Sequence, residues 1–191
     1  MVTMGITFRQ RRWTRKEYDQ AIQAGIFHED ERLELLAGCL VVAEPQNTPH
    51  AVGIQLAAET LRMAFGPGWS VRVQLPLALD PDSEPEPDVA VVRGQPRDYL
   101  LDHPGEPALV VEVADASLRL DRRLKAAIYA RGGIADYWIV NVADRVLEIH
   151  HQPVHQGRRW RYRSVETLGA DAAVAPLALP QARIAVADLL P

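Results

Sequence analysis

Two nearly continuous apolar runs, at residues 88–92 and 107–114, most constrain how this chain can fold. Strands that face solvent on one side alternate apolar and polar residues, whereas strands covered on both faces are apolar throughout. The two runs therefore predict central strands of a sheet with helices on each face. A carboxylate interrupts the second run at Glu112, and another, Asp88, opens the first.

The neighbouring segments predict a mixed sheet of six or seven strands with a helix on each face, which is a three-layer α/β plan. Capping residues, apolar spacing and terminal glycines predict helices at 14–25, 50–65 and 119–131. Alternating or paired apolar runs predict the remaining strands. They form two hairpins, 32–36 paired with 39–43 and 137–142 paired with 145–150. A further strand is predicted at 69–79 and an edge strand at 160–165.

Length and composition predict one globular domain over 1–191, with a core at about 13–150 and a C-terminal extension at 151–191. We expect its last part, 170–191, which prolines interrupt, to wrap the surface. The sequence has no apolar stretch of membrane-spanning length and no pattern of a secretory signal. Its single cysteine, Cys39, precludes an internal disulfide, so the expected location is the reducing cytoplasm.

The formal net charge of −4 argues against indiscriminate binding to a nucleic-acid backbone. Arginines nevertheless cluster at 9–15, 119–123 and 158–163, and such patches are compatible with phosphate contacts. The last cluster mixes arginines with aromatic residues, as surfaces that stack single strands do. An edge strand that is protected by charge explains the same pattern, and we favour it.

Lysine is rare in this chain, which has two lysines and nineteen arginines. One of them, Lys125, comes after Asp88 and Glu112 in the sequence and lies on the helix predicted at 119–131. A lysine ammonium is a compact charge with a tunable pKa, which a guanidinium is not. The predicted apolar stripe of this helix is Leu120, Leu124 and Ile128, so Lys125 would lie at its edge and reach toward the sheet. Codon preference for arginine is the alternative explanation of its rarity.

Glu112 predicts a metal site, because a carboxylate among apolar residues is costly to bury unless it is paired or binds a metal. Carboxylates on adjacent strands, such as Asp88 and Glu112, repel each other unless a cation neutralises them. Oxygen ligands favour Mg²⁺ or Mn²⁺, which polarises a phosphodiester oxygen and activates water. Lys125 would then orient that water or neutralise the charge of the transition state. The competing interpretation is a structural Glu112–Lys125 ion pair without chemistry.

One series of residues extends from the first apolar run to the predicted strand at 137–142. It consists of Pro87-Asp88, Glu112-Val113, Asp121, Lys125, Tyr129, Gly132-Gly133 and Asp136-Tyr137-Trp138. This series resembles the Uma-type family of putative restriction endonucleases, a branch of the PD-(D/E)XK nuclease superfamily. The resemblance covers about residues 13–150.

The resemblance implies a restriction-endonuclease-like fold in which Asp88 and Glu112 are catalytic and bind the metal, helped by the backbone carbonyl of Val113. Ala114 stands where the superfamily usually carries a lysine, and Lys125 fits the position to which this branch has moved it. The resemblance also makes a homodimer conceivable, since related nucleases use two sites for two strands. No heptad pattern or clear apolar patch supports the dimer.

Further acidic and aromatic residues are candidates for supporting roles. Glu34 alternates with apolar residues at 32–36, and the superfamily often adds a carboxylate from this region. It is either a further metal ligand or a solvated strand-face residue. Asp121, four residues before Lys125, is expected to hold that lysine, and Tyr129 belongs to the family series.

The remaining candidates are polar residues with two interpretations each. His50 is a catalytic base or a capping residue, and we favour capping because nothing nearby in the sequence fixes its tautomer. Gln74 points into the site or is an exposed amide. Ser117 caps the helix of Lys125 or is a nucleophile, and we favour capping because no histidine stands near it in the sequence. The later histidines His150, His151 and His155 form a metal-binding tract or are exposed polar residues, and we favour exposure because no carboxylate supports them in their predicted loop.

The sequence thus predicts a Mg²⁺- or Mn²⁺-dependent endonuclease that hydrolyses nucleic-acid phosphodiester bonds, with DNA as the expected substrate. A second hypothesis is a catalytically inactive nucleic-acid-binding or assembly module on the same fold. The carboxylates of Asp88 and Glu112 discriminate between the two hypotheses. They should approach one another in a nuclease, and point to different sides of the sheet in a binding module.

Overall fold

The computed structural model describes residues 10–28, 30–43 and 45–191, and its centre is a six-stranded sheet in the order β3-β4-β5-β6-β7-β8. The strands are β3 (Trp69–Val73), β4 (Val89–Arg93), β5 (Leu109–Ala114), β6 (Asp136–Asn141), β7 (Val146–Gln156) and β8 (Arg159–Gly169). All neighbouring strands are antiparallel except β5 and β6, which are parallel. The predicted mixed sheet is therefore confirmed.

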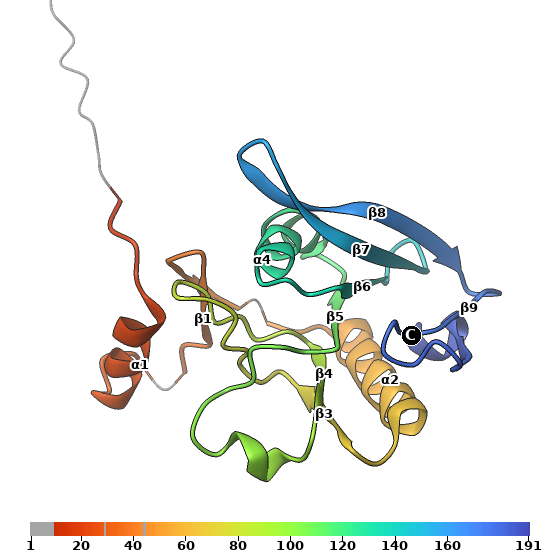
Figure 1. Ribbon diagram of the computed structural model, residues 1–191, viewed down its shortest axis with the longest axis horizontal. Coiled ribbons are helices and arrows are strands. Elements are labelled where there is room, and N and C mark those ends of the chain that lie inside the picture. Colours follow the sequence, from red (N-terminus) through yellow and green to blue (C-terminus); the bar gives the residue numbers. More distant parts are fainter. Residues whose placement is uncertain (1–9, 29, 44) are drawn as a thin grey trace, which may run out of the picture.

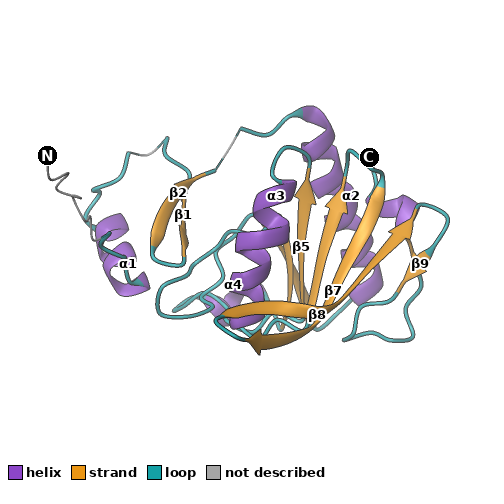
Figure 2. Ribbon diagram, turned by 90° about the horizontal axis from the view of Figure 1, so that it is seen from above, coloured by secondary structure: helices purple, strands orange, loops and turns teal. Residues whose placement is uncertain are grey.

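Helices cover both faces of this sheet (Figures 1 and 2). One face packs against α2 (Thr48–Phe65). The other packs against a continuous helical segment formed by α3 (Leu118–Leu120), the π-helical turn η2 (Asp121–Lys125) and α4 (Ala126–Arg131). This segment is the crossover that the parallel strands β5 and β6 require. The three-layer plan is thus confirmed as well.

A smaller N-terminal part lies beside the sheet (Figure 2). It contains α1 (Arg15–Gln23) and the hairpin of β1 (Leu33–Leu36) with β2 (Cys39–Val42). The capping box predicted at the start of α1 forms between Thr14 and Glu17. Leu35 and Glu84 exchange backbone hydrogen bonds of 3.3 and 2.7 Å, and these bonds attach the hairpin to the segment that precedes β4.

Successive side chains of β5 point to opposite faces of the sheet, as in any strand. Its odd-numbered residues are buried in the core beneath α2, and its even-numbered apolar residues pack against α4. Glu112 is even-numbered, so it lies on the side of α4. Helix α2 approaches the opposite face closely at Gly53, where an added Cβ would lie 2.8 Å from Val113 Cγ1.

The chain beyond residue 150 belongs to the sheet and to the core. β7 and β8 pair over most of their length, and β8 is the predicted edge strand. The expectation that 170–191 wraps the surface is wrong. Its short elements are β9 (Ala173–Val174), β10 (Ile184–Ala185) and the 3-10 helix η3 (Val186–Leu189). Within them, Val174, Ile184, Val186 and Leu189 are buried in the same core cluster as residues of α2. Prolines interrupt the regular structure there without preventing burial.

The strand predicted over 69–79 ends at Val73. Gln74 adopts a φ of 49°, and Pro76 has no N–H to donate to a neighbouring strand. A further 3-10 helix, η1 (Pro96–Tyr99), follows β4. Among the described residues, no helix combines the length and the apolarity that crossing a bilayer requires.

Candidate active site

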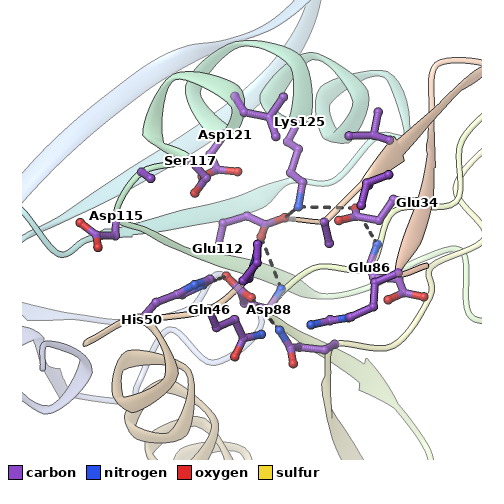
Figure 3. A pocket seen from close by; sticks show the side chains of 18 of the residues that line it. Glu34, Gln46, His50, Glu86, Asp88, Glu112, Asp115, Ser117, Asp121 and Lys125 are labelled. Atoms are coloured by element: carbon purple, nitrogen blue, oxygen red, sulfur yellow. Dashed lines mark hydrogen bonds and ion pairs between the residues drawn. The ribbon is translucent and has the colours of Figure 1, made fainter. Parts of the chain in front are cut away.

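A pocket of about 440 Å³ opens between the β1–β2 hairpin, the start of α2 and the helical segment that follows β5 (Figure 3). Its charged lining comprises six carboxylates, one lysine and one arginine. These residues are Glu34, Glu86, Asp88, Glu112, Asp115, Asp121, Lys125 and Arg32. Such an excess of carboxylates in one partly buried pocket is unfavourable unless a cation is present.

Asp88 and Glu112 are neighbours across two strands. Val89 pairs with Val111, so the same register continued by one residue places Asp88 opposite Glu112. Asp88 Oδ2 accepts a hydrogen bond of 2.8 Å from the Val113 N–H, and Glu112 Oε2 accepts one of 3.4 Å from the Asp88 N–H. Both carboxylates therefore lie on one side of the sheet, inside the same pocket.

Lys125 reaches this pair from the facing helical segment (Figure 3). Its Nζ lies 3.0 Å from Glu112 Oε1 and 3.5 Å from Glu34 Oε2. Glu34 Oε2 also accepts a hydrogen bond of 3.1 Å from the Glu86 N–H. The lysine thus links the β1–β2 hairpin to strand β5.

Burial dominates the electrostatics of the pocket. It raises the pKa of Glu112 well above its ordinary value, although Lys125 opposes this effect. Burial likewise raises the pKa of Asp121 to about 6, against the opposing effects of Lys125 and the Ser117 hydroxyl. For Lys125, burial alone would lower the pKa, but the carboxylates of Glu112 and Glu34 outweigh it and raise the pKa. The lysine therefore stays charged, and further positive charge in the pocket would favour the ionised form of the carboxylates.

The helical segment presents polar residues to the sheet, which contradicts the stripe predicted from the sequence. Leu124 is 36% exposed, whereas Asp121 and Lys125 are 1% and 6% exposed. These two residues begin and end the π-helical turn η2. Such turns are rare in proteins, and those that occur are often found at functional sites. The wider turn departs from the 3.6-residue period, and the facing carboxylates compensate the charge of Lys125.

The supporting contacts of this segment differ in part from expectation. The Tyr129 hydroxyl donates to Glu112 Oε1 at 2.5 Å. Ser117 occupies the N-cap position as expected, but its side chain makes no capping hydrogen bond, because its hydroxyl donates to Asp121 Oδ2 at 2.6 Å. Among the described residues, Asp121 forms no salt bridge with Lys125, although its charge helps to raise the lysine pKa. Asp121 therefore acts on Lys125 through charge and not through a direct contact.

His50 and Gln74 both contact Asp88. His50 Nε2 lies 3.1 Å from Asp88 Oδ2, and this hydrogen bond raises the pKa of His50. In the described part of the chain, no residue nearby in the sequence hydrogen-bonds to the His50 ring, as expected, and its hydrogen-bond partner is Asp88, which is distant in sequence. The cap of α2 is Asn47, which accepts from the His50 N–H. Gln74 Nε2 donates to Asp88 Oδ1 at 3.3 Å, so its side chain points into the pocket.

Two later histidines lie outside the pocket. Contrary to expectation, they are not exposed. His150 is 5% exposed and packs against the rings of Tyr137 and Tyr162. His151 Nε2 lies 2.8 Å from Asp136 Oδ1. The expectation failed because β7 continues past residue 150 and is covered there, whereas His155, farther along, is exposed.

Two carboxylates of the pocket, Glu86 and Asp115, were not identified from the sequence as candidate site residues. Glu86 stands two residues before Asp88, and residues at this spacing share a face of an extended chain, which is a signal that could have identified it. Burial and then the charge of Glu34 raise the pKa of Glu86. Asp115 directly follows β5 and accepts a hydrogen bond from the side-chain amide of Asn47. Only the fold brings Asn47 to it.

The donor set fits a hard divalent cation. Asp88 and Glu112 offer carboxylate oxygens from adjacent strands, and Glu34 lies across the pocket. In the described ranges, no three His, Cys, Asp or Glu side chains are grouped closely enough to enclose a metal by themselves. Mg²⁺ suits such a partial set because it usually retains several waters. A cation would also relieve the cost of ionising Glu112 at its buried position.

Comparisons with known proteins agree with this architecture. The model of the Uma2 family, described as putative restriction endonuclease, matches residues 15–187. A crystal structure of a putative nuclease belonging to DUF820 from Anabaena variabilis is similar, with a TM-score of 0.66 and 10% sequence identity. The match covers 87% of this chain and 94% of that chain, and it shows a common fold. No curated protein matches the chain. Because the family model spans most of the sequence, the chain belongs to the Uma2 family of putative restriction endonucleases.

Proposed function

We propose that this protein is a metal-dependent endonuclease that hydrolyses phosphodiester bonds in DNA, with Mg²⁺ or Mn²⁺ as its cofactor. One observation carries the proposal: Asp88 and Glu112 lie side by side on one face of the sheet, with Lys125 Nζ 3.0 Å from Glu112 Oε1. Membership of a nuclease family supports the same reaction class.

Each residue of the pocket has a role in this proposal. Asp88 and Glu112 hold the cation, and Glu34 and the backbone carbonyl of Val113 are further candidate ligands. When bound, the cation supplies positive charge to phosphodiester oxygens and lowers the pKa of a water. The Lys125 ammonium stabilises the negative charge that develops on the phosphate.

The remaining contacts orient the two carboxylates. His50 and Gln74 contact different oxygens of Asp88, and Tyr129 donates to Glu112. Carboxylates that are held in this way lose little rotational freedom when a ligand binds, which is the basis of a preorganised site. Asp121 adds to the charge that keeps Lys125 protonated.

The second candidate function is a catalytically inactive binding or assembly module. The observation that favours it is that Lys125 and Tyr129 both engage Oε1 of Glu112, as they would in a purely structural ion pair. The orientation of Asp88 and Glu112 to the same side of the sheet weighs against it. A homodimer, which the family resemblance makes conceivable, is compatible with either function.

The test is a cleavage assay with Mg²⁺ or Mn²⁺ on single-stranded, double-stranded and structured DNA and RNA. Asp88→Asn and Glu112→Gln should each abolish cleavage and weaken Mn²⁺ binding in calorimetry, with an unchanged circular dichroism spectrum. The matched control Glu166→Gln removes an exposed carboxylate of β8 and should change neither. Wild-type cleavage by either pocket variant would exclude this assignment. Metal binding without cleavage of any substrate would favour the inactive module.

A further inference from the structure

A second groove lies on the opposite side of the η2–α4 helical segment from the candidate active site. Its volume is about 880 Å³, and no carboxylate is among the described residues that line it. Its charged residues are all arginines, namely Arg12, Arg123, Arg131, Arg158 and Arg159. We call it the arginine groove. On a chain with a net charge of −4, it concentrates positive charge in one place.

Three of these arginines are available to bind an anion. Arg131 is paired with Asp80 and Asp82, and Arg12 donates to the Ala37 carbonyl at 3.1 Å. The other three, Arg123, Arg158 and Arg159, are exposed and have no salt-bridge partner within the described part of the chain. Their charge is therefore not neutralised by neighbouring carboxylates.

The arginine groove and the active-site pocket share their dividing walls. Lys125 lines the pocket, whereas Arg123 and Leu124, on the same turn, line the groove. On the β1–β2 hairpin, Leu36 lines the pocket and Ala37 lines the groove. The negative pocket repels a polyanion, so electrostatic attraction for a nucleic acid must come from a neighbouring surface. The arginine groove is such a surface.

Trp160 gives the arginine groove an aromatic side. It is 36% exposed and lies beside His155, with ring centroids 5.1 Å apart, near the end of the β7–β8 hairpin. This hairpin extends over α4 (Figure 1). Cations that contact the backbone and an aromatic ring on which a base stacks are the combination that binds single strands. The position of β8 at the sheet edge leaves this combination accessible.

We propose that the arginine groove binds a segment of single-stranded nucleic acid, with Arg123, Arg158 and Arg159 contacting phosphates and Trp160 stacking on a base. The proposal rests on the nuclease function for its biological meaning, because it describes where substrate outside the cleaved bond is held. Binding itself is measurable without cleavage.

The experiment measures fluorescence anisotropy of a labelled single-stranded oligodeoxynucleotide in EDTA over a series of NaCl concentrations. The triple variant Arg123→Gln/Arg158→Gln/Arg159→Gln should bind about 10-fold more weakly at low salt. Its plot of log K against log salt should have a slope smaller by about 2, since each lost phosphate contact on a single strand removes about 0.7. Trp160→Ala should weaken binding about 5- to 150-fold, whereas Trp160→Phe should retain most of the wild-type affinity.

A matched triple variant controls for net charge. Arg62→Gln/Arg97→Gln/Arg183→Gln removes the same charge from exposed positions outside the arginine groove and should leave most of the affinity intact. Equal losses in both triple variants overturn the proposal, as does unchanged affinity in the groove variant. A groove variant that alters the oligomeric state in light scattering but not binding also overturns it, because the groove is then an interface between copies.

The same proteins separate this proposal from the proposed function. If the wild type binds through the groove residues but cleaves no substrate, the groove proposal stands and the nuclease proposal fails. If the wild type cleaves and its binding does not depend on the groove residues, the nuclease proposal stands and the groove proposal fails.

Discussion

The ammonium of Lys125 lies 3.0 Å from Glu112 Oε1 and 3.5 Å from Glu34 Oε2. The buried ammonium of Lys125 therefore neutralises carboxylates from the central strand β5 and from the N-terminal hairpin. Removing one partner of a buried pair costs about 3–5 kcal/mol, because the other charge is left uncompensated. In the proposed function the same contacts would serve a catalytic role as well as a structural one, so variants of Lys125 must be measured for both.

We expect Lys125→Ala to lower kcat by about 100-fold or more, because the charge that stabilises the transition state is lost. Affinity for Mn²⁺, measured by calorimetry, should be retained. The free energy of unfolding in urea should fall by about 3 kcal/mol. Lys125→Arg should also impair turnover, since a planar guanidinium does not replace a compact ammonium.

The control for this prediction is Lys16→Ala, which removes the other lysine from an exposed position on α1. It should keep both turnover and stability. Rates are compared only for protein that circular dichroism shows to be folded. Wild-type turnover in both Lys125 variants would mean that the lysine is structural.

Glu34→Gln should weaken Mn²⁺ binding about 10-fold, the size of effect seen for residues that support a metal site. The glutamine keeps an acceptor for the Glu86 N–H, so the hairpin should remain in place. Calorimetry on the variant and on Glu31→Gln, an exposed residue just before the hairpin, checks the prediction. Unchanged affinity in Glu34→Gln would show that Glu34 only neutralises Lys125.

The central strands and the residues that meet there were accessible from the sequence. Strands buried on both faces leave an unmistakable apolar signal, and a charge such as Glu112 within that signal is costly unless something compensates it. The contact of His50 with Asp88 was not accessible, because the two residues come from different elements. Local sequence carries no information on such a distant partner.

The inner face of the helical segment was predicted wrongly for a related reason. Apolar periodicity assumes a regular helix whose buried face is apolar. Here η2 departs from that regular period, and Asp121 and Lys125 are buried because carboxylates, a hydroxyl and an ammonium compensate them across space. Burial of a polar residue depends on its partners, which periodicity does not show.

Glu84 should make stability depend on pH. Burial, and then the charge of Asp19, outweigh Arg15 and raise the pKa of Glu84 from 4.5 to about 7. Because the folded-state pKa is the higher one, its stabilising contribution is full below about pH 4.5 and is lost as the pH rises through about 7. Glu84→Gln removes this loss and should be more stable than the wild type at about pH 8, by roughly 3 kcal/mol.

Urea unfolding of the wild type and of Glu84→Gln at both ends of this pH range measures the effect. The exposed Glu59→Gln on α2 is the control and should follow the wild type. A stability difference between Glu84→Gln and the wild type that does not grow with pH would contradict the assigned shift.

Gly53 should be required for the close packing of α2 behind the pocket. An added Cβ would lie 2.8 Å from Val113 Cγ1, well inside the distance of about 3.5–4.0 Å at which carbon atoms attract. Gly53→Ala should therefore destabilise the protein by about 1–2 kcal/mol. Overpacking destabilises the fold by more than the higher helix propensity of alanine stabilises it. The Val113 N–H donates to Asp88, so the displacement should also lower activity.

The double variant Gly53→Ala/Val113→Ala tests the cause of this effect. Val113→Ala alone leaves a cavity, and the methyl group that Gly53→Ala introduces would occupy part of that space. The double variant should therefore be more stable than the sum of the single effects predicts, by about 1 kcal/mol in urea unfolding. Strictly additive effects would show that α2 does not meet β5 at this pair of residues.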